Sequence, residues 1–130
     1  MDERFRAIFS VRLLMLCLWC GVIFAFSEMP GSGSGVEPPL WYVLERKSAH
    51  VFEYAVLAIL AFRYFSALFL RETFNRVILL AASFSLAYGM LDELHQFFVF
   101  GRGARFTDVL VDGIGIVLAL GVVTLFRRRR

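Results

Sequence analysis

The stretch that decides the fold runs from Tyr88 to Gly115 and reads YGMLDELHQFFVFGRGARFTDVLVDGIG. Between two strongly apolar runs it keeps a set of polar side chains, most of them ionisable: Asp92, Glu93, His95, Gln96, Arg102, Arg105, Asp108 and Asp112. Each ionisable group near the centre of a bilayer costs roughly 3 kcal/mol or more. A chain that keeps so many of them beside membrane-length apolar segments therefore indicates a polar site.

The composition is that of an integral membrane protein. Hydrophobic residues make up 59% of the 130 residues, well above the roughly 45–50% of a soluble domain. The net charge of +3 depends on the four arginines at 127–130. Directly after an apolar helix, such a tail indicates an anchor facing anionic lipid rather than an arm that binds nucleic acid. We therefore expect a membrane partner and no nucleic-acid partner.

Four apolar segments are long enough to cross a bilayer, which needs about 20 residues. We expect an all-α bundle of four transmembrane helices at residues 7–26, 46–69, 76–98 and 107–126, in a single domain over residues 1–130. Leu40 to Glu45 is expected to form a short helix on the membrane surface, and Thr107 to cap the last helix. The first segment has the basic start of a signal peptide. Its apolar run exceeds the usual ~7–15 residues, so we favour an uncleaved helix.

The positive residues predict the topology. Lysine and arginine cluster at the N-terminus, between the second and third helices, and at the C-terminus. The positive-inside rule then places both termini in the cytoplasm and the first and third loops outside. The polar parts of the second, third and fourth helices would lie at one level, in the outer half of the membrane. The expected site is a cleft that is open to the outer leaflet, with carboxylates deeper than basic groups.

The second half of this site is expected in the first turns of the second helix. Lys47, His50 and Tyr54 follow the spacing of one helical face, and Glu53 borders it. We assign acid–base roles to Glu93, His95 and His50. Ligand-binding roles go to the remaining polar residues of both stretches: Lys47, Glu53, Tyr54, Asp92, Gln96, Arg102, Arg105, Asp108 and Asp112.

Three interpretations of these residues remain open. In the favoured one, the arginines grip the phosphate or carboxylate of an outer-leaflet lipid, a lipid-linked envelope component or a lipid-tailed glycopeptide. In the second, Glu93 or Asp92 with His95, and His50 with Glu53, act as acid and base in hydrolysis or transfer of a lipid headgroup. In the third, the polar groups pair with one another and hold the bundle together. No spacing typical of a metal site is present, so we expect no metal and no other cofactor.

The order and spacing of these polar residues resemble the VanZ-like family. The resemblance covers roughly residues 45–120 and rests on Lys47-x-x-His50-x-x-x-Tyr54, Asp92-Glu93-x-His95-Gln96, Gly101-Arg102, Asp108-Val109 and Gly115. It implies a small multi-pass protein of the bacterial cytoplasmic membrane, in a family whose founding member is linked to teicoplanin resistance. Two positions depart from the family pattern: Asp112 stands where relatives usually carry Asn, and Phe100 where they often carry Pro. No motif decides whether the chain forms a homodimer.

Overall fold

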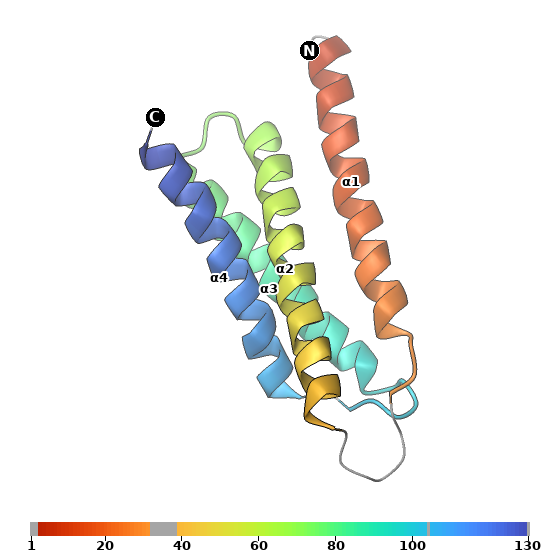
Figure 1. Ribbon diagram of the computed structural model, residues 1–130. Helices are drawn as coiled ribbons and strands as arrows, with labels where there is room; N and C mark the ends of the chain where they lie inside the picture. Colours follow the sequence, from red (N-terminus) through yellow and green to blue (C-terminus); the bar gives the residue numbers. More distant parts are fainter. Residues whose placement is uncertain (1–2, 32–38, 104, 130) are drawn as a thin grey trace.

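Four α-helices run alternately up and down in the computed structural model (Figure 1). The structure describes residues 3–31, 39–103 and 105–129, and the side chains within these ranges from residue 9 onward. The helices are α1 (Glu3–Ser27), α2 (Leu40–Leu68), α3 (Phe74–Gln96) and α4 (Phe106–Arg128), with no strand in the described ranges. Each helix is long and apolar enough to cross a membrane. The prediction of an all-α protein with four transmembrane helices is confirmed.

All four helices begin earlier than the sequence predicts, and two of these starts overturn a specific expectation. The surface helix expected before Arg46 does not exist separately, because α2 begins at Leu40 and continues without a break. No glycine or proline interrupts that stretch, and Pro39, in an extended conformation, precedes it as the N-cap. Arg105 occupies the N-cap position of the last helix in place of Thr107, without a side-chain capping hydrogen bond. The reason is that the backbone N–H of Arg105 donates a 2.9 Å hydrogen bond to the carboxylate of Glu93, which fixes the chain at that point.

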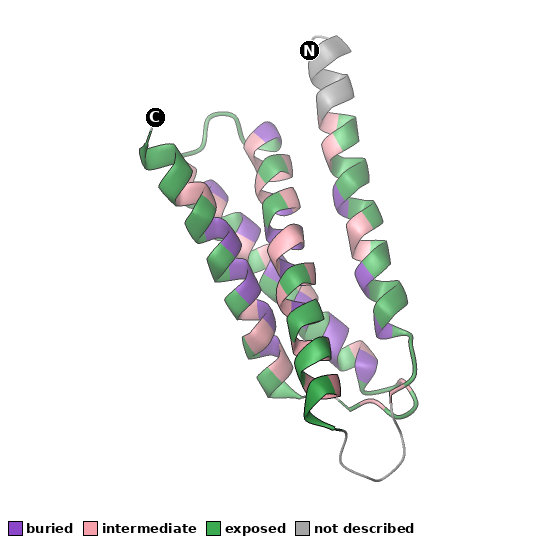
Figure 2. Cartoon of the chain, in the orientation of Figure 1, coloured by how far each residue is buried: buried purple, intermediate pink, exposed green. Residues whose placement is uncertain are grey.

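α2 and α3 each pack against all three other helices, whereas α1 and α4 do not contact each other in the described structure, and α2 makes the most extensive contacts. Its buried side includes Tyr54 and Leu57, which together with Ala81 of α3 belong to the fully buried core. Many large apolar side chains on all four helices are exposed, and exposed positions run along the outward sides of the helices (Figure 2). Exposed apolar surface on this scale is expected where lipid surrounds the bundle.

The backbones of α2 and α4 approach each other closely at Gly115. A Cβ atom at Gly115 would lie 2.3 Å from the carbonyl oxygen of Val51, so only glycine lets the two backbones approach this closely. This approach brings the polar residues in the first turns of α2 beside those in the first turns of α4.

The connections at one end of the bundle touch each other. The backbone N–H of Gly31 donates a 3.1 Å hydrogen bond to the carbonyl of Phe100, and Gly101 turns the chain with φ 73°. Both ends of the chain lie at the opposite end of the bundle (Figure 1). The α1–α2 and α3–α4 connections therefore meet on one side of the membrane, which the arginine distribution predicts to be the outer side.

Candidate functional site

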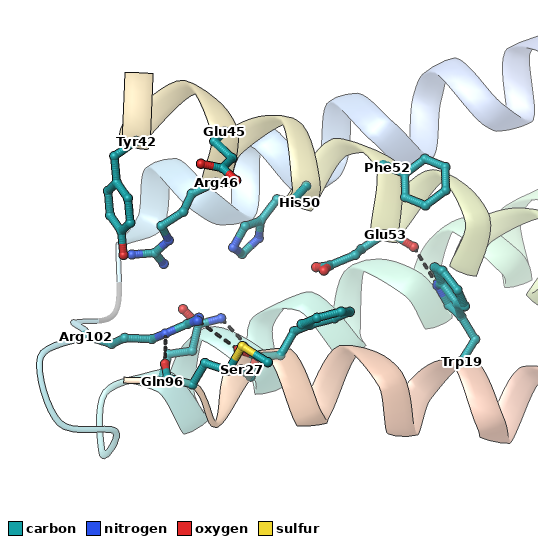
Figure 3. Close-up of a pocket in the computed structure, with 13 residues that line it drawn as sticks. Trp19, Ser27, Tyr42, Glu45, Arg46, His50, Phe52, Glu53, Gln96 and Arg102 are labelled. Carbon is teal, nitrogen blue, oxygen red and sulfur yellow. Dashed lines mark hydrogen bonds between the residues drawn. The ribbon is translucent and has the colours of Figure 1, made fainter. Parts of the chain in front are cut away.

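A pocket of about 480 Å³ lies near these connections, between the end of α1 and the first half of α2. Gln96, from the last turn of α3, and Arg102, from the α3–α4 connection, complete its wall (Figure 3). The lining combines charged and polar side chains with aromatic and other apolar ones: Trp19, Phe26, Ser27, Met29, Tyr42, Glu45, Arg46, Ala49, His50, Phe52, Glu53, Gln96 and Arg102.

The lining is graded along α2. Arg46 and Arg102 lie at the end marked by Tyr42, and Glu53 lies farther along α2, toward Trp19 (Figure 3). Tyr42, Arg46, Ala49 and Glu53 recur every three or four residues, so a single face of α2 supplies the lining. The pocket is therefore basic at the end near Tyr42, and the side chain of Glu53 points back along it toward His50, away from Trp19 (Figure 3).

Arg102 ties the end of α1 to the α3–α4 connection. Its Nε donates a 2.7 Å hydrogen bond to the carbonyl of Met29, and Nη2 donates one of 2.8 Å to that of Phe26. Burial, followed by the positive charge of Arg46, lowers the pKa of Arg102, although arginine stays protonated in proteins. These two bonds leave three of its five N–H donors free for a ligand.

The opposite side of α2 pairs with α4. Nδ1 of His50 lies 2.8 Å from Oδ1 of Asp112, and Nζ of Lys47 lies 3.3 Å from Oδ1 of Asp108. The first pair is nearly inaccessible, whereas Lys47 keeps 40% of its side chain exposed. Because His50 also lines the pocket, Asp112 fixes the orientation of an imidazole that borders the ligand space.

A second polar cluster joins α1 to α3. The hydroxyl of Ser27 donates to Oδ1 of Asp92, and Nε2 of Gln96 donates to Oδ2 of Asp92 at 2.8 Å. Nε2 of Gln96 also lies 3.1 Å from the Ser27 hydroxyl. All three residues are buried, and Asp92 is satisfied by its neighbours rather than presented to the pocket.

Glu93 and His95 point to different places. One oxygen of Glu93 accepts the backbone N–H of Arg105, and the other is buried without a partner in the described structure. His95 lies 2.7 Å from a carboxylate oxygen of Glu28 at the exposed rim, and its ring lies 4.8 Å from that of Phe24 at a tilt of 34°. The structure therefore does not bring the expected acid–base pair of Glu93 and His95 together.

A buried polar group lies deeper in the bundle. The hydroxyl of Tyr54, the hydroxyl of Ser85 and Oδ2 of Asp112 are all buried without a hydrogen-bond partner in the described structure. Gly89 lets two of these side chains approach, since a Cβ there would lie 3.0 Å from Oδ2 of Asp112 and 3.2 Å from the ring of Tyr54. Tyr54 accordingly belongs to the core and not to the pocket wall.

The structure thus divides the predicted residues. Those that line the pocket are His50, Glu53, Gln96 and Arg102. Those that face other helices, the rim or the surface are Lys47, Tyr54, Asp92, Glu93, His95, Arg105, Asp108 and Asp112. In the described ranges, no three histidine, cysteine, aspartate or glutamate side chains converge on a point where a metal ion would fit.

The sequence reasoning missed several lining residues. Arg46 lies seven residues before Glu53. Residues two helical turns apart lie on the same face, so this spacing could have predicted that Arg46 lines the pocket together with Glu53. Trp19 and Ser27 come from α1, where only the apolar character was informative. Their position on the pocket wall follows from how α1 packs, which no local pattern indicates.

Comparison with known proteins agrees with the motif. A family model described as VanZ/LLP1 matches residues 12–127. The match covers most of the chain, so the protein belongs to the VanZ/LLP1 family. Comparison with curated proteins and with solved structures gives no match.

Proposed function

We propose that this member of the VanZ/LLP1 family binds the anionic headgroup of a membrane lipid or of a lipid-linked envelope component. One observation carries the proposal: Arg46 and Arg102 approach the same end of the pocket (Figure 3). They are near enough for the charge of Arg46 to lower the pKa of Arg102. Two positive charges repel each other, so an anion between them stabilises the arrangement. Arginine binds phosphate and carboxylate through paired hydrogen bonds.

The walls of the pocket favour a ligand that comes from the bilayer. Phe26 and Phe52 line it, and both belong to helices of membrane-spanning length. A free polar metabolite would gain nothing from these surfaces, whereas an acyl chain or an isoprenoid tail would bury apolar area against them. The ligand class is therefore a lipid with an anionic head, in the outer leaflet of the bacterial cytoplasmic membrane if the predicted topology holds.

The proposal extends to antibiotic resistance through the family. The founding member of the VanZ-like family is linked to resistance to teicoplanin, a lipid-tailed glycopeptide. A pocket with arginines and aromatic walls suits either such a molecule or the lipid-linked component that it attacks. Expression of this chain in a susceptible bacterium should raise the inhibitory concentration of teicoplanin more than that of vancomycin, which lacks the lipid tail.

A membrane-embedded enzyme is a second candidate, because of the 2.8 Å contact between His50 and Asp112. A carboxylate on Nδ1 orients the ring and stabilises the imidazolium that forms when Nε2 takes a proton. The pocket would then hydrolyse or transfer a lipid headgroup, with the arginines stabilising charge on the phosphate. A His50→Asn variant that still binds lipid but loses headgroup turnover would favour this candidate over simple binding.

The decisive experiment for binding is lipid analysis of the purified full chain. Wild-type protein should retain a lipid that carries phosphate through purification, and Arg46→Gln should lose most of it. The side chain of Arg46 makes no hydrogen bond to another described residue, so the substitution removes a ligand contact and no hydrogen bond within the protein. Arg105→Gln is the matched control, since Arg105 is exposed and does not line the pocket. Equal lipid on the wild type and on Arg46→Gln would refute the proposal.

A further inference from the structure

The pocket contains a carboxylate, that of Glu53, whose presence the binding of an anionic headgroup does not explain. Glu53 lines the pocket and is half-buried, and no donor in the described ranges bonds its side-chain oxygens. In the described structure, its hydrogen bond to another helix is made by the backbone, where its carbonyl accepts a 2.9 Å hydrogen bond from Nε1 of Trp19. A carboxylate held away from water in this way requires a proton or a positively charged partner.

The surroundings of Glu53 suit a cation from a ligand. The rings of Trp19 and Phe52, which also line the pocket, lie 6.1 Å apart and nearly perpendicular to each other. Aromatic faces attract a cation that has been removed from water. Glu53 supplies the hydrogen-bond acceptors that these rings lack.

The charges of the pocket agree with a ligand that carries both signs. Arg46 and Arg102 are offset by Glu45 and Glu53, so with His50 neutral the lining side chains carry no net charge. At the end near Tyr42 the two arginines outnumber Glu45, which lies beside Arg46, whereas Glu53 lies farther along α2 (Figure 3). A purely anionic head would gain from the arginines but would be repelled by Glu53.

The spacing sets the size of the ligand. Arg46 and Glu53 are seven residues apart on one helix, a rise of about 10 Å. Over that backbone rise, a charge-assisted hydrogen bond of about 2.8 Å at each end would leave room for a head of only a few atoms, roughly 5 Å long. A phosphate and an amine joined by a two-carbon linker span such a distance.

We propose that the pocket recognises a zwitterionic headgroup, with its phosphate between Arg46 and Arg102 and a primary ammonium at Glu53. The inference rests on the proposed binding of an anionic lipid head and adds selectivity to it. A primary ammonium fits better than a quaternary one, because only the former donates hydrogen bonds to the carboxylate oxygens of Glu53.

Binding of defined lipids to the purified, delipidated full chain tests this proposal. The probes are phosphatidylethanolamine, phosphatidylglycerol and phosphatidylcholine with the same short acyl chains. Wild-type protein should bind phosphatidylethanolamine about tenfold more tightly than phosphatidylglycerol, the effect of one charged hydrogen bond. Glu53→Gln should remove this preference while phosphatidylglycerol binding is kept or strengthened, and Glu53→Asp should retain part of it.

Glu72→Gln is the matched control, because Glu72 pairs with Arg76 in the connection between α2 and α3 and does not line the pocket. Equal affinity of the wild type for phosphatidylethanolamine and phosphatidylglycerol would overturn the inference and leave the proposed function standing. If the wild type binds phosphatidylcholine as tightly as phosphatidylethanolamine, a hydrogen bond from a primary ammonium to Glu53 is ruled out. If none of the three lipids binds, the proposed function itself fails.

Discussion

Gly115→Ala should destabilise the bundle, because the seam between α2 and α4 has no room for a methyl group. A Cβ at this position would lie 2.3 Å from the carbonyl oxygen of Val51 and 3.1 Å from the backbone nitrogen of Ala55. Ordinary contact begins near 3.4 Å, so α4 would have to move by about 1 Å. The 2.8 Å contact between His50 and Asp112 would then stretch beyond hydrogen-bonding distance.

The magnitude follows from two opposing terms. Overpacking a tight core costs roughly 1–3 kcal/mol, whereas alanine gains about 1 kcal/mol over glycine inside a helix. The clash is with backbone atoms, which cannot rotate away, so we expect the upper part of the first range. The free energy of unfolding should fall by about 1–2 kcal/mol in the balance.

Thermal unfolding in detergent, followed by circular dichroism, measures this effect. Gly121→Ala is the matched control, because it lies on the same helix and its added Cβ meets nothing within 4 Å. The control should keep or raise the Tm, and Gly115→Ala should lower it. If the two variants unfold at the same temperature, the close approach of α2 and α4 is not what holds this seam.

Three further predictions concern the polar residues and the topology. Asp112→Ala should destabilise the protein by about 3–5 kcal/mol, since it leaves its buried partner His50 unpaired. Asp108→Ala should cost at most about 1 kcal/mol, because its partner Lys47 is half-exposed. Comparing the Tm values of the two variants checks this difference. Arg102→Gln should loosen the end of α1 and speed proteolysis there, whereas Arg105→Gln should not. A single cysteine at Gly103, where an added Cβ meets nothing within 4 Å, should react with an impermeant thiol reagent from outside the cell; labelling only after lysis would refute the topology.

Helix number and type followed from the sequence, because four long apolar runs leave a chain few alternatives to spanning the membrane four times. The exact starts did not. Leu40 to Glu45 has the amphipathic ring pair typical of an interface, which favoured a separate surface helix, yet nothing in it breaks the helix that follows. Continuity of backbone hydrogen bonding decided the boundary, and side-chain polarity did not indicate it.

The polar site was predictable at the level of helix ends but not at the level of partners. The sequence placed His50, Glu53, Gln96 and Arg102 near one another, and all four line the pocket. It did not predict that His95 would contact Glu28, because that contact depends on where α1 ends against α3.

The contacts of α1 explain why its position escaped prediction. Trp19 donates to the carbonyl of Glu53, Tyr88 donates to the carbonyl of Cys20, and Arg102 donates to two carbonyls near the end of α1. In each case one partner is a backbone carbonyl, which any residue supplies. Hydrogen bonds of this kind hold helices together in lipid, where the hydrophobic effect gives no preference for helix over lipid, and they leave no residue pattern to recognise.

The same distinction separates ligand-binding residues from structural ones. On the α4 side of α2, Lys47 and His50 each find a carboxylate partner, Asp108 and Asp112 respectively. On the α1 side, Arg46 and Glu53 face the pocket with no hydrogen-bond partner for their charged groups in the described structure. Pairing between helices therefore explains why Lys47 and His50 are polar, but it does not explain why Arg46 and Glu53 are charged. An unpaired charge on a membrane-spanning helix is costly, and a charged ligand in the pocket removes that cost.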